Sequence, residues 1–70
     1  MLDTNNTFTE YNDIVTTREL MEMLHIGKSK AYELLKNNEI KSIKLGDTGR
    51  VYYIPKINVI AYLNGKIFSN

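Results

Sequence analysis

The spacing of apolar residues changes along this chain at Asn37 and Asn38. Before that point apolar residues recur at helical intervals of three and four, and directly after it they alternate with polar residues as in a half-buried strand. A chain of 70 residues has room for one small domain, and the change of period predicts a mixed α+β class. The order of the elements then decides which α+β fold is adopted.

A first helix is predicted to begin directly after Thr16. Thr16 and Glu19 have the spacing of a capping box, in which each side chain accepts a hydrogen bond from the other residue's backbone N–H. Val15 and Leu20 flank this box at the positions of a hydrophobic staple. The apolar stripe of this short helix is formed by Leu20, Met23 and Leu24.

A second helix is predicted over residues 28–37, after an interruption at residues 25–27. Glycine adopts backbone angles that other residues resist, so we expect Gly27 to make the tight reversal and His25 to act as a cap or a packed ring. Two short amphipathic helices joined in this way form a helix-turn-helix unit. The buried side of the second helix is expected to hold Ala31, Leu34 and Leu35.

A two-stranded hairpin and a third helix are predicted to follow. Ile43 and Leu45 alternate with polar residues, residues 46–49 have turn chemistry, and residues 50–54 are rich in β-branched and aromatic side chains. Pro55 ends the second strand and opens a helix over residues 56–64, capped by Asn64 and Gly65. The side of this helix expected to face the core holds Ile57, Ile60, Ala61 and Leu63. The aromatic side chains expected to fill the core rather than stack on bases are Tyr52, Tyr53, Tyr62 and Phe68.

Helix, turn, helix, wing hairpin and C-terminal helix are together the elements of a small α+β winged helix-turn-helix. We expect residues 14–65 to form this domain, residues 1–13 to be a flexible N-terminal tail, and residues 66–70 to be a C-terminal tail.

Charge is distributed unevenly, although the net charge is only +1. Residues 1–24 carry five carboxylates and one arginine, whereas residues 25–70 carry eight lysines or arginines and three carboxylates. A basic surface of this kind favours a polyanionic partner such as nucleic acid. Counts this small also fluctuate by chance, so the charge distribution alone does not distinguish a polyanion-binding surface from an ordinary solvated one.

The composition excludes several kinds of site. With no cysteine there is no disulfide and no Cys-based zinc site, and a sole histidine, His25, cannot form a multi-histidine metal site. The longest apolar run is the five residues 59–63, too short to span a bilayer. We therefore expect a non-enzymatic cytoplasmic protein with no metal, no cofactor and no membrane association.

Several stretches follow one another in an order typical of a known family: VTTREL (15–20), LHIGKSKAY (24–32), IKLG (43–46) and IPK (54–56). Together they make residues 14–63 similar to the excisionase-type, MerR-like helix-turn-helix domains. The sequence departs from that family at two positions: Gly27 stands where a capping serine is usual, and Tyr53 stands where many members carry a basic wing residue.

The resemblance implies a protein that binds double-stranded DNA, with its second helix in the major groove and its wing on the backbone or minor groove. Excisionases of this kind bend DNA beside the attachment sites of a mobile element and assist an integrase in DNA recombination. We expect such a sequence-specific architectural role, with an integrase and neighbouring copies of the chain as further partners. Only seven residues follow Leu63, so we expect no domain for a small-molecule effector. The alternatives are a small transcription regulator with the same fold and, further off, an antirepressor-type protein-interaction module.

The candidate DNA contacts lie on the exposed face of the second helix and on the hairpin. Cations hold phosphates, and a few side chains in the first turn of a recognition helix read base edges. The predicted helix contacts are Lys28, Ser29, Lys30, Tyr32, Glu33 and Lys36, and the predicted wing contacts are Lys44 and Arg50. Lys41 and Lys56 are expected to add only long-range attraction. The simpler alternative is a solvated helix face and lysines that protect a strand edge.

Overall fold

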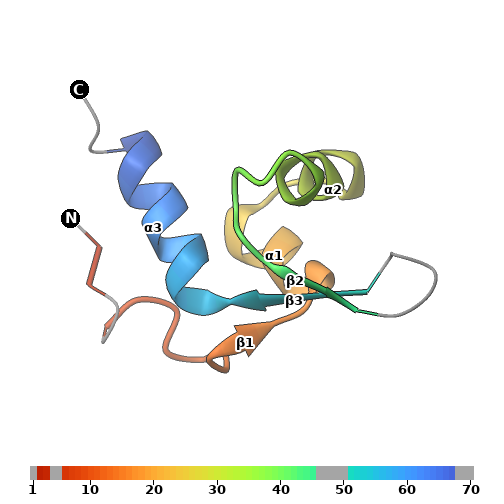
Figure 1. The fold of residues 1–70 in the computed structure, drawn as a ribbon. Helices are drawn as coiled ribbons and strands as arrows, with labels where there is room; N and C mark the ends of the chain where they lie inside the picture. Colours follow the sequence, from red (N-terminus) through yellow and green to blue (C-terminus); the bar gives the residue numbers. More distant parts are fainter. Residues whose placement is uncertain (1, 4–5, 46–50, 68–70) are drawn as a thin grey trace.

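Three helices pack on one side of a three-stranded antiparallel sheet (Figure 1). The computed structural model describes residues 2–3, 6–45 and 51–67. The elements follow in the order β1 (Ile14–Val15), α1 (Thr17–Leu24), α2 (Lys28–Lys36), β2 (Ile43–Leu45), β3 (Val51–Pro55) and α3 (Lys56–Ile67). The predicted winged helix-turn-helix is confirmed, with one strand more than the sequence indicates.

The start of α1 follows the predicted capping box. The Glu19 backbone N–H donates to Thr16 Oγ1 at 3.2 Å, and the Thr16 N–H donates to Glu19 Oε1 at 3.0 Å. Val15 and Leu20, the two staple residues, are both completely buried. Capping and staple thus fix where the chain enters the first helix, and a cap of this kind contributes about 1 kcal/mol.

The reversal after α1 is made by His25, so the prediction that Gly27 makes it is wrong. His25 has φ 55° and ψ 47°, the left-handed conformation of a helix C-cap, as expected for a capping histidine. The next backbone N–H, that of Ile26, donates to the Met21 carbonyl at 3.1 Å, which closes the helix end. Gly27 has φ −81° and ψ 173°, an extended conformation open to any residue, and it is the N-cap of α2.

The hairpin pairs β2 with β3, and β1 pairs with the other edge of β3. The partners across the hairpin are Ile43 with Tyr53 and Lys44 with Tyr52, while Val15 lies opposite Ile54. The two-residue strand β1 is absent from the sequence prediction because two residues are too few to show an alternating pattern. The predicted turn at residues 46–49 lies outside the described residues.

The third helix is rotated relative to the prediction. Val59 and Ile60 are its buried residues, whereas Ile57 is 58% exposed and Ala61 is also exposed. The backbone N–H of Lys56 donates to the Asp13 carbonyl at 2.7 Å, so contact with the segment before β1 sets how the helix begins.

The predicted cap at Asn64 and Gly65 is also wrong, because α3 continues to Ile67. A glycine inside a helix costs about 1 kcal/mol but does not end it. In the last turns, the Lys66 amine lies 5.7 Å from the centre of the Tyr62 ring and 3.9 Å from Glu39 Oε1. These contacts favour helix beyond the glycine.

The core lies between the sheet and the helices. Among the described residues no polar or charged side chain is buried. Ile40, in the connection from α2 to β2, is 1% exposed and joins this core although the sequence pattern did not single it out. The buried residues are Val15, Leu20, Met23, Ala31, Leu34, Leu35, Ile40, Ile54, Val59 and Ile60.

The segment before β1 contacts α3 at both ends of that helix. The Lys56 amine donates to the carbonyls of Phe8 at 3.3 Å and Tyr11 at 3.0 Å, and the backbone N–H of Leu2 donates to Asn64 Oδ1 at 2.8 Å. These hydrogen bonds are the contacts through which the N-terminal segment docks on α3. Lys56 is thereby directed at the N-terminal segment. The flexibility of residues 1–13 stays a prediction.

Candidate nucleic-acid interface

The exposed face of α2 carries most of the predicted DNA contacts. Three buried residues on its other side, Ala31, Leu34 and Leu35, fix the helix on the core. The exposed residues follow from a helix that turns by about 100° per residue. Those among the candidates are Lys28, Ser29, Lys30, Glu33 and Lys36.

One ion pair modifies the charge of this face. Lys30 Nζ lies 3.4 Å from Glu33 Oε2, one turn along the helix, and both side chains are 54% exposed. A pair this exposed contributes at most about 1 kcal/mol, so it can open when another anion or donor approaches. Lys28 and Lys36 form no ion pair with a described carboxylate, and they leave the face basic.

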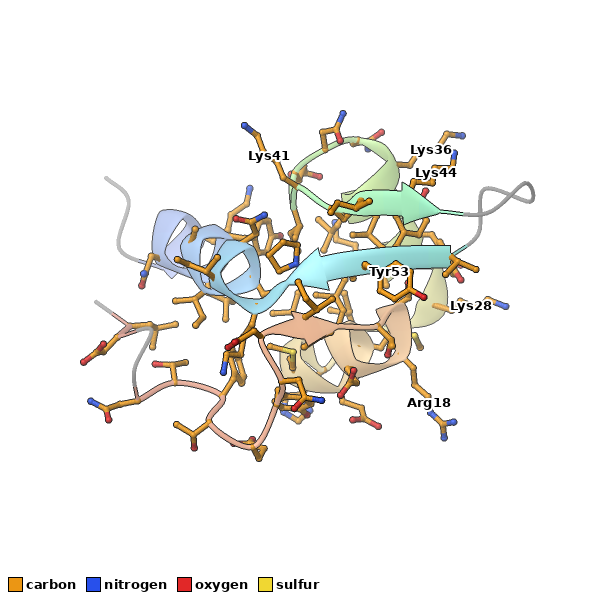
Figure 2. All side chains as sticks on the ribbon, turned by 60° about the horizontal axis from the view of Figure 1, so that its bottom comes forward. Arg18, Lys28, Lys36, Lys41, Lys44 and Tyr53 are labelled. Carbon is orange, nitrogen blue, oxygen red and sulfur yellow. The ribbon has the colours of Figure 1, made fainter. Side chains whose placement is uncertain are left out.

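Lys44 lies on the side of the sheet that faces α2. It is paired across the hairpin with Tyr52, and directly opposed residues of an antiparallel pair point to the same face. The Tyr52 ring meets the ring of Tyr32 on α2 edge-on, with centroids 6.0 Å apart. In the view of Figure 2, Lys36 and Lys44 extend towards the same edge of the drawing. The hairpin and the lysine-bearing helix are therefore joined by an aromatic contact.

Tyr32, one of the predicted DNA contacts, is half-buried, and its ring packs on Tyr52 of the hairpin. Tyr52 fills the space between hairpin and helix as expected, whereas Tyr53 is 41% exposed on the other side of β3, contrary to its predicted place in the core. Strand alternation explains the difference, since neighbouring residues on a strand point to opposite faces. Arg50 and Phe68 lie outside the described residues, and the wing contact of Arg50 stays a prediction.

Arg18 is a cation that the sequence reasoning passed over. It is exposed in the first turn of α1, and it extends from the same end of the molecule as Lys28 (Figure 2). Arg18 is the one basic residue among the acidic residues 1–24, so the charge pattern does not distinguish it as a candidate DNA contact. Its position beside the hairpin depends on tertiary structure, which no local pattern reveals. It lines a shallow hollow of about 250 Å³ with Thr16, Thr17, Tyr32, Val51, Tyr52 and Tyr53.

Three of the five carboxylates in residues 1–24 act on Tyr11. Partial burial, followed by the carboxylates of Glu22, Glu10 and Glu19, raises the pKa of Tyr11 above its ordinary value of 10.0. These carboxylates belong to α1 and to the segment before β1.

Within the described ranges, no three His, Asp or Glu side chains are grouped closely enough to hold a metal ion. His25 is exposed and serves as the C-cap of α1. Across these same ranges, no helix combines the length and the apolar character needed to cross a bilayer.

A family model described as a helix-turn-helix domain matches residues 14–66, which run from β1 to all but the last residue of α3. No curated protein and no solved structure matches the chain.

Proposed function

This chain belongs to the excisionase-type helix-turn-helix domain family, and on that premise we propose that it is a sequence-specific double-stranded DNA-binding protein with an excisionase-like architectural role. Family membership supports DNA binding as such. The proposed role is to bend DNA at a mobile element and so assist an integrase in excision, in the cytoplasm.

The observation that carries the proposal is the common side shared by the lysines of α2 and Lys44 of β2. Lys28 and Lys36 are exposed and free of described carboxylates, and Lys44 is held on the α2 side of the sheet through the pairing of Tyr52 with Tyr32. A helix flanked by a hairpin in this way fits a duplex, with the helix in the major groove and the hairpin on the adjoining backbone.

The candidate residues divide by chemistry into those that bind the phosphate backbone and those that contact base edges. Lys36 and Lys44 attract phosphates and release counterions, a contribution that does not depend on sequence. Ser29 and Lys30 lie in the first turn of α2, where side chains reach base edges. Lys suits the O6 and N7 acceptors of guanine, and Glu33 can accept from cytosine N4 once its ion pair with Lys30 opens.

The small size of the domain favours a protein that binds DNA together with other proteins or further copies of itself over one that finds its site alone. A single DNA-binding module covers about 600–1,000 Å² of protein surface, which gives limited specificity by itself. Repeated sites, neighbouring copies or an integrase would supply the rest of the sequence specificity. Bending would add contacts that a straight duplex does not offer.

The first test is the salt dependence of binding to a labelled duplex, measured by fluorescence anisotropy. About five phosphate contacts predict that log K falls with log salt at a slope of about −4 to −5. Lys44→Ala is expected to reduce the slope by about 1, whereas Lys66→Ala, the matched control on α3, leaves it unchanged. A wild-type slope near zero would contradict the proposal that this protein binds DNA through phosphate contacts.

The second test separates the excisionase role from that of a small transcription regulator. Bending is measured by energy transfer between dyes at the duplex ends, and excision is measured in a reaction that contains the proposed integrase partner and DNA with its attachment sites. Bending together with stimulated excision supports the proposal. Repression of a promoter without either effect would favour the regulator, and partner capture that survives combined loss of Lys28, Lys30 and Lys44 would favour an interaction module.

A further inference from the structure

The sheet has an outer face, turned away from the three helices, that is apolar and uncovered. It is formed by Ile14, Ile43, Val51 and Tyr53, and Ile57 adjoins it from the first turn of α3. These five are the large apolar side chains that are exposed within the described part of the chain, with exposed fractions of 41–58%. Small proteins seldom leave a contiguous apolar patch in water unless something binds it.

The pairing of the strands makes this surface continuous. Along β3, Tyr52 and Ile54 point to the helices, so Val51, Tyr53 and Pro55 point outward. Ile43 lies directly opposite Tyr53, and Ile14 lies directly opposite Pro55. An antiparallel sheet with one solvated face normally alternates apolar with polar residues. Here the outer face carries apolar residues where polar ones are usual, as in sheets that are covered on both sides.

Cations flank the outer sheet face on two sides. Lys41 lies beside the first turn of α3, because its carbonyl accepts a hydrogen bond of 3.0 Å from Asn58 Nδ2. Arg18 lines one hollow with Val51 and Tyr53 of this face, and the same hollow extends to Tyr32 and Tyr52. In Figure 2, which looks onto this face, Tyr53 lies in front of β3, and Lys41 and Arg18 extend beyond the sheet in opposite directions.

The local carboxylates do not neutralise these cations. Neither Lys41 nor Arg18 forms an ion pair with a described carboxylate. The acidic residues nearest in sequence to β1 are Asp13, which precedes it, and Glu19, whose side chain accepts the Thr16 backbone N–H. Within the described residues, Arg18 and Lys41 are therefore unpaired cations at the margins of the apolar face.

We propose that the outer sheet face docks a polypeptide segment of a partner protein in which large apolar side chains are flanked by aspartate or glutamate. The apolar side chains would cover Ile43 and Tyr53, and the carboxylates would meet Arg18 and Lys41. A second copy of this chain fits less well, because a symmetric contact would bring two sets of these cations together. Duplex DNA offers phosphates but nothing to cover an apolar surface.

This face is opposite the one on which Tyr52 meets α2, so the partner leaves the α2 lysines free. The proposal does not depend on DNA binding, and either can fail without the other.

The test is a selection of phage-displayed random peptides on the immobilised full chain, followed by anisotropy titration with the best peptide in synthetic, labelled form. Selected sequences are expected to be rich in acidic and large apolar residues. Ile43→Lys is expected to weaken peptide binding by about tenfold or more, since it replaces a buried apolar contact with a charge. Arg18→Glu is expected to weaken it as well.

Asn37→Lys is the matched control, because it adds the same charge at the exposed C-cap of α2 and should leave peptide affinity unchanged. Thermal unfolding of each variant verifies the fold. No enrichment over the Ile43→Lys protein, or enrichment of basic peptides, would overturn the proposal. So would a concentration-dependent dimer that Ile43→Lys abolishes, or displacement of the peptide by saturating duplex.

Discussion

The two helices of the helix-turn-helix unit begin in different ways. At the start of α1, Thr16 and Glu19 satisfy each other's backbone N–H groups, and a fully buried staple lies beside them. At the start of α2 stands Gly27, which has no side chain to accept a hydrogen bond. The first N–H groups of α2 therefore remain available at the end of the helix that carries Lys28 and Lys30.

This difference separates stability from binding. The closed start of α1 stabilises the free protein and presents little to a ligand. The open start of α2 forgoes that stabilisation, and its helix dipole adds to the positive charge of the lysines. We therefore expect substitutions in α1 to change the free energy of unfolding and substitutions on the exposed face of α2 to change DNA binding.

The largest expected effect is that of Leu20→Ala in α1. Leu20 is completely buried, and removal of such a side chain costs about 3 kcal/mol through lost burial and the cavity left behind. Urea denaturation measures the loss. Leu20→Met keeps the volume and should cost less than about 1.5 kcal/mol. Equal costs for the two variants would show that α1 is not packed as described.

Ser29→Ala and Lys30→Ala in α2 are expected to change the preference among DNA sequences. A lost base contact reduces discrimination by about 1–3 kcal/mol, while exposed positions leave stability nearly unchanged. Competition between the preferred duplex and single-base variants measures the effect. If the two variants and Lys44→Ala all weaken every duplex equally, the division into residues that contact base edges and residues that bind the phosphate backbone is wrong.

Thr16→Ala removes one half of the capping box and should cost about 1 kcal/mol in the free energy of unfolding. Thr16→Ser retains the hydroxyl and serves as the control. The salt dependence of DNA binding should be the same for both variants and the wild type. A changed slope would contradict the separation of stability from binding.

Gly27→Ser gives α2 the cap that it lacks, and open space surrounds the position of the added Cβ. The serine side chain and the stiffer backbone together should raise the free energy of unfolding by about 0.5–1 kcal/mol. The midpoint of urea denaturation should rise accordingly. An unchanged or lower midpoint would mean that the first turn of α2 is not open in the free protein.

The smallest expected effect is the pH dependence contributed by Tyr11. Its pKa is raised in the folded state by partial burial and by Glu22, Glu10 and Glu19, so its protonated form stabilises the fold. This stabilisation is fully present below pH 10.0 and is lost as the pH rises through the folded pKa. Tyr11→Phe should flatten the decline in urea midpoint at alkaline pH, and Glu22→Gln should reduce it. A decline as steep in Tyr11→Phe as in the wild type would exclude this contribution.

Local patterns predicted the parts of the fold that local interactions determine. The capping box at Thr16 and Glu19 and the buried side of α2 depend on residues three or four positions apart, and both are found as expected. The pairing of β2 with β3 followed from alternation on either side of a turn. The exposure of Lys28, Ser29 and Lys30 followed from helical geometry alone.

The errors fall where distant contacts decide. The strand β1 is recognisable only from its partners, and α3 begins where the Lys56 backbone N–H donates to the carbonyl of Asp13, which is distant in the sequence. The left-handed conformation at the end of α1 is adopted by His25, although glycine adopts it more readily and Gly27 stands two residues later. The place of Arg18 beside Tyr53 depends on how α1 lies against β3.

The central claim is that the exposed face of α2 and Lys44 of β2 engage one duplex. Titration of the isotope-labelled protein with its preferred duplex, followed by amide chemical shifts in NMR spectra, tests it most directly. The account predicts that the largest changes occur in Lys28–Lys36 and at Lys44, while Ile57 and the residues around Tyr11 change little. Changes confined to the outer sheet face or the acidic segment, with the amides of α2 unmoved, would contradict it.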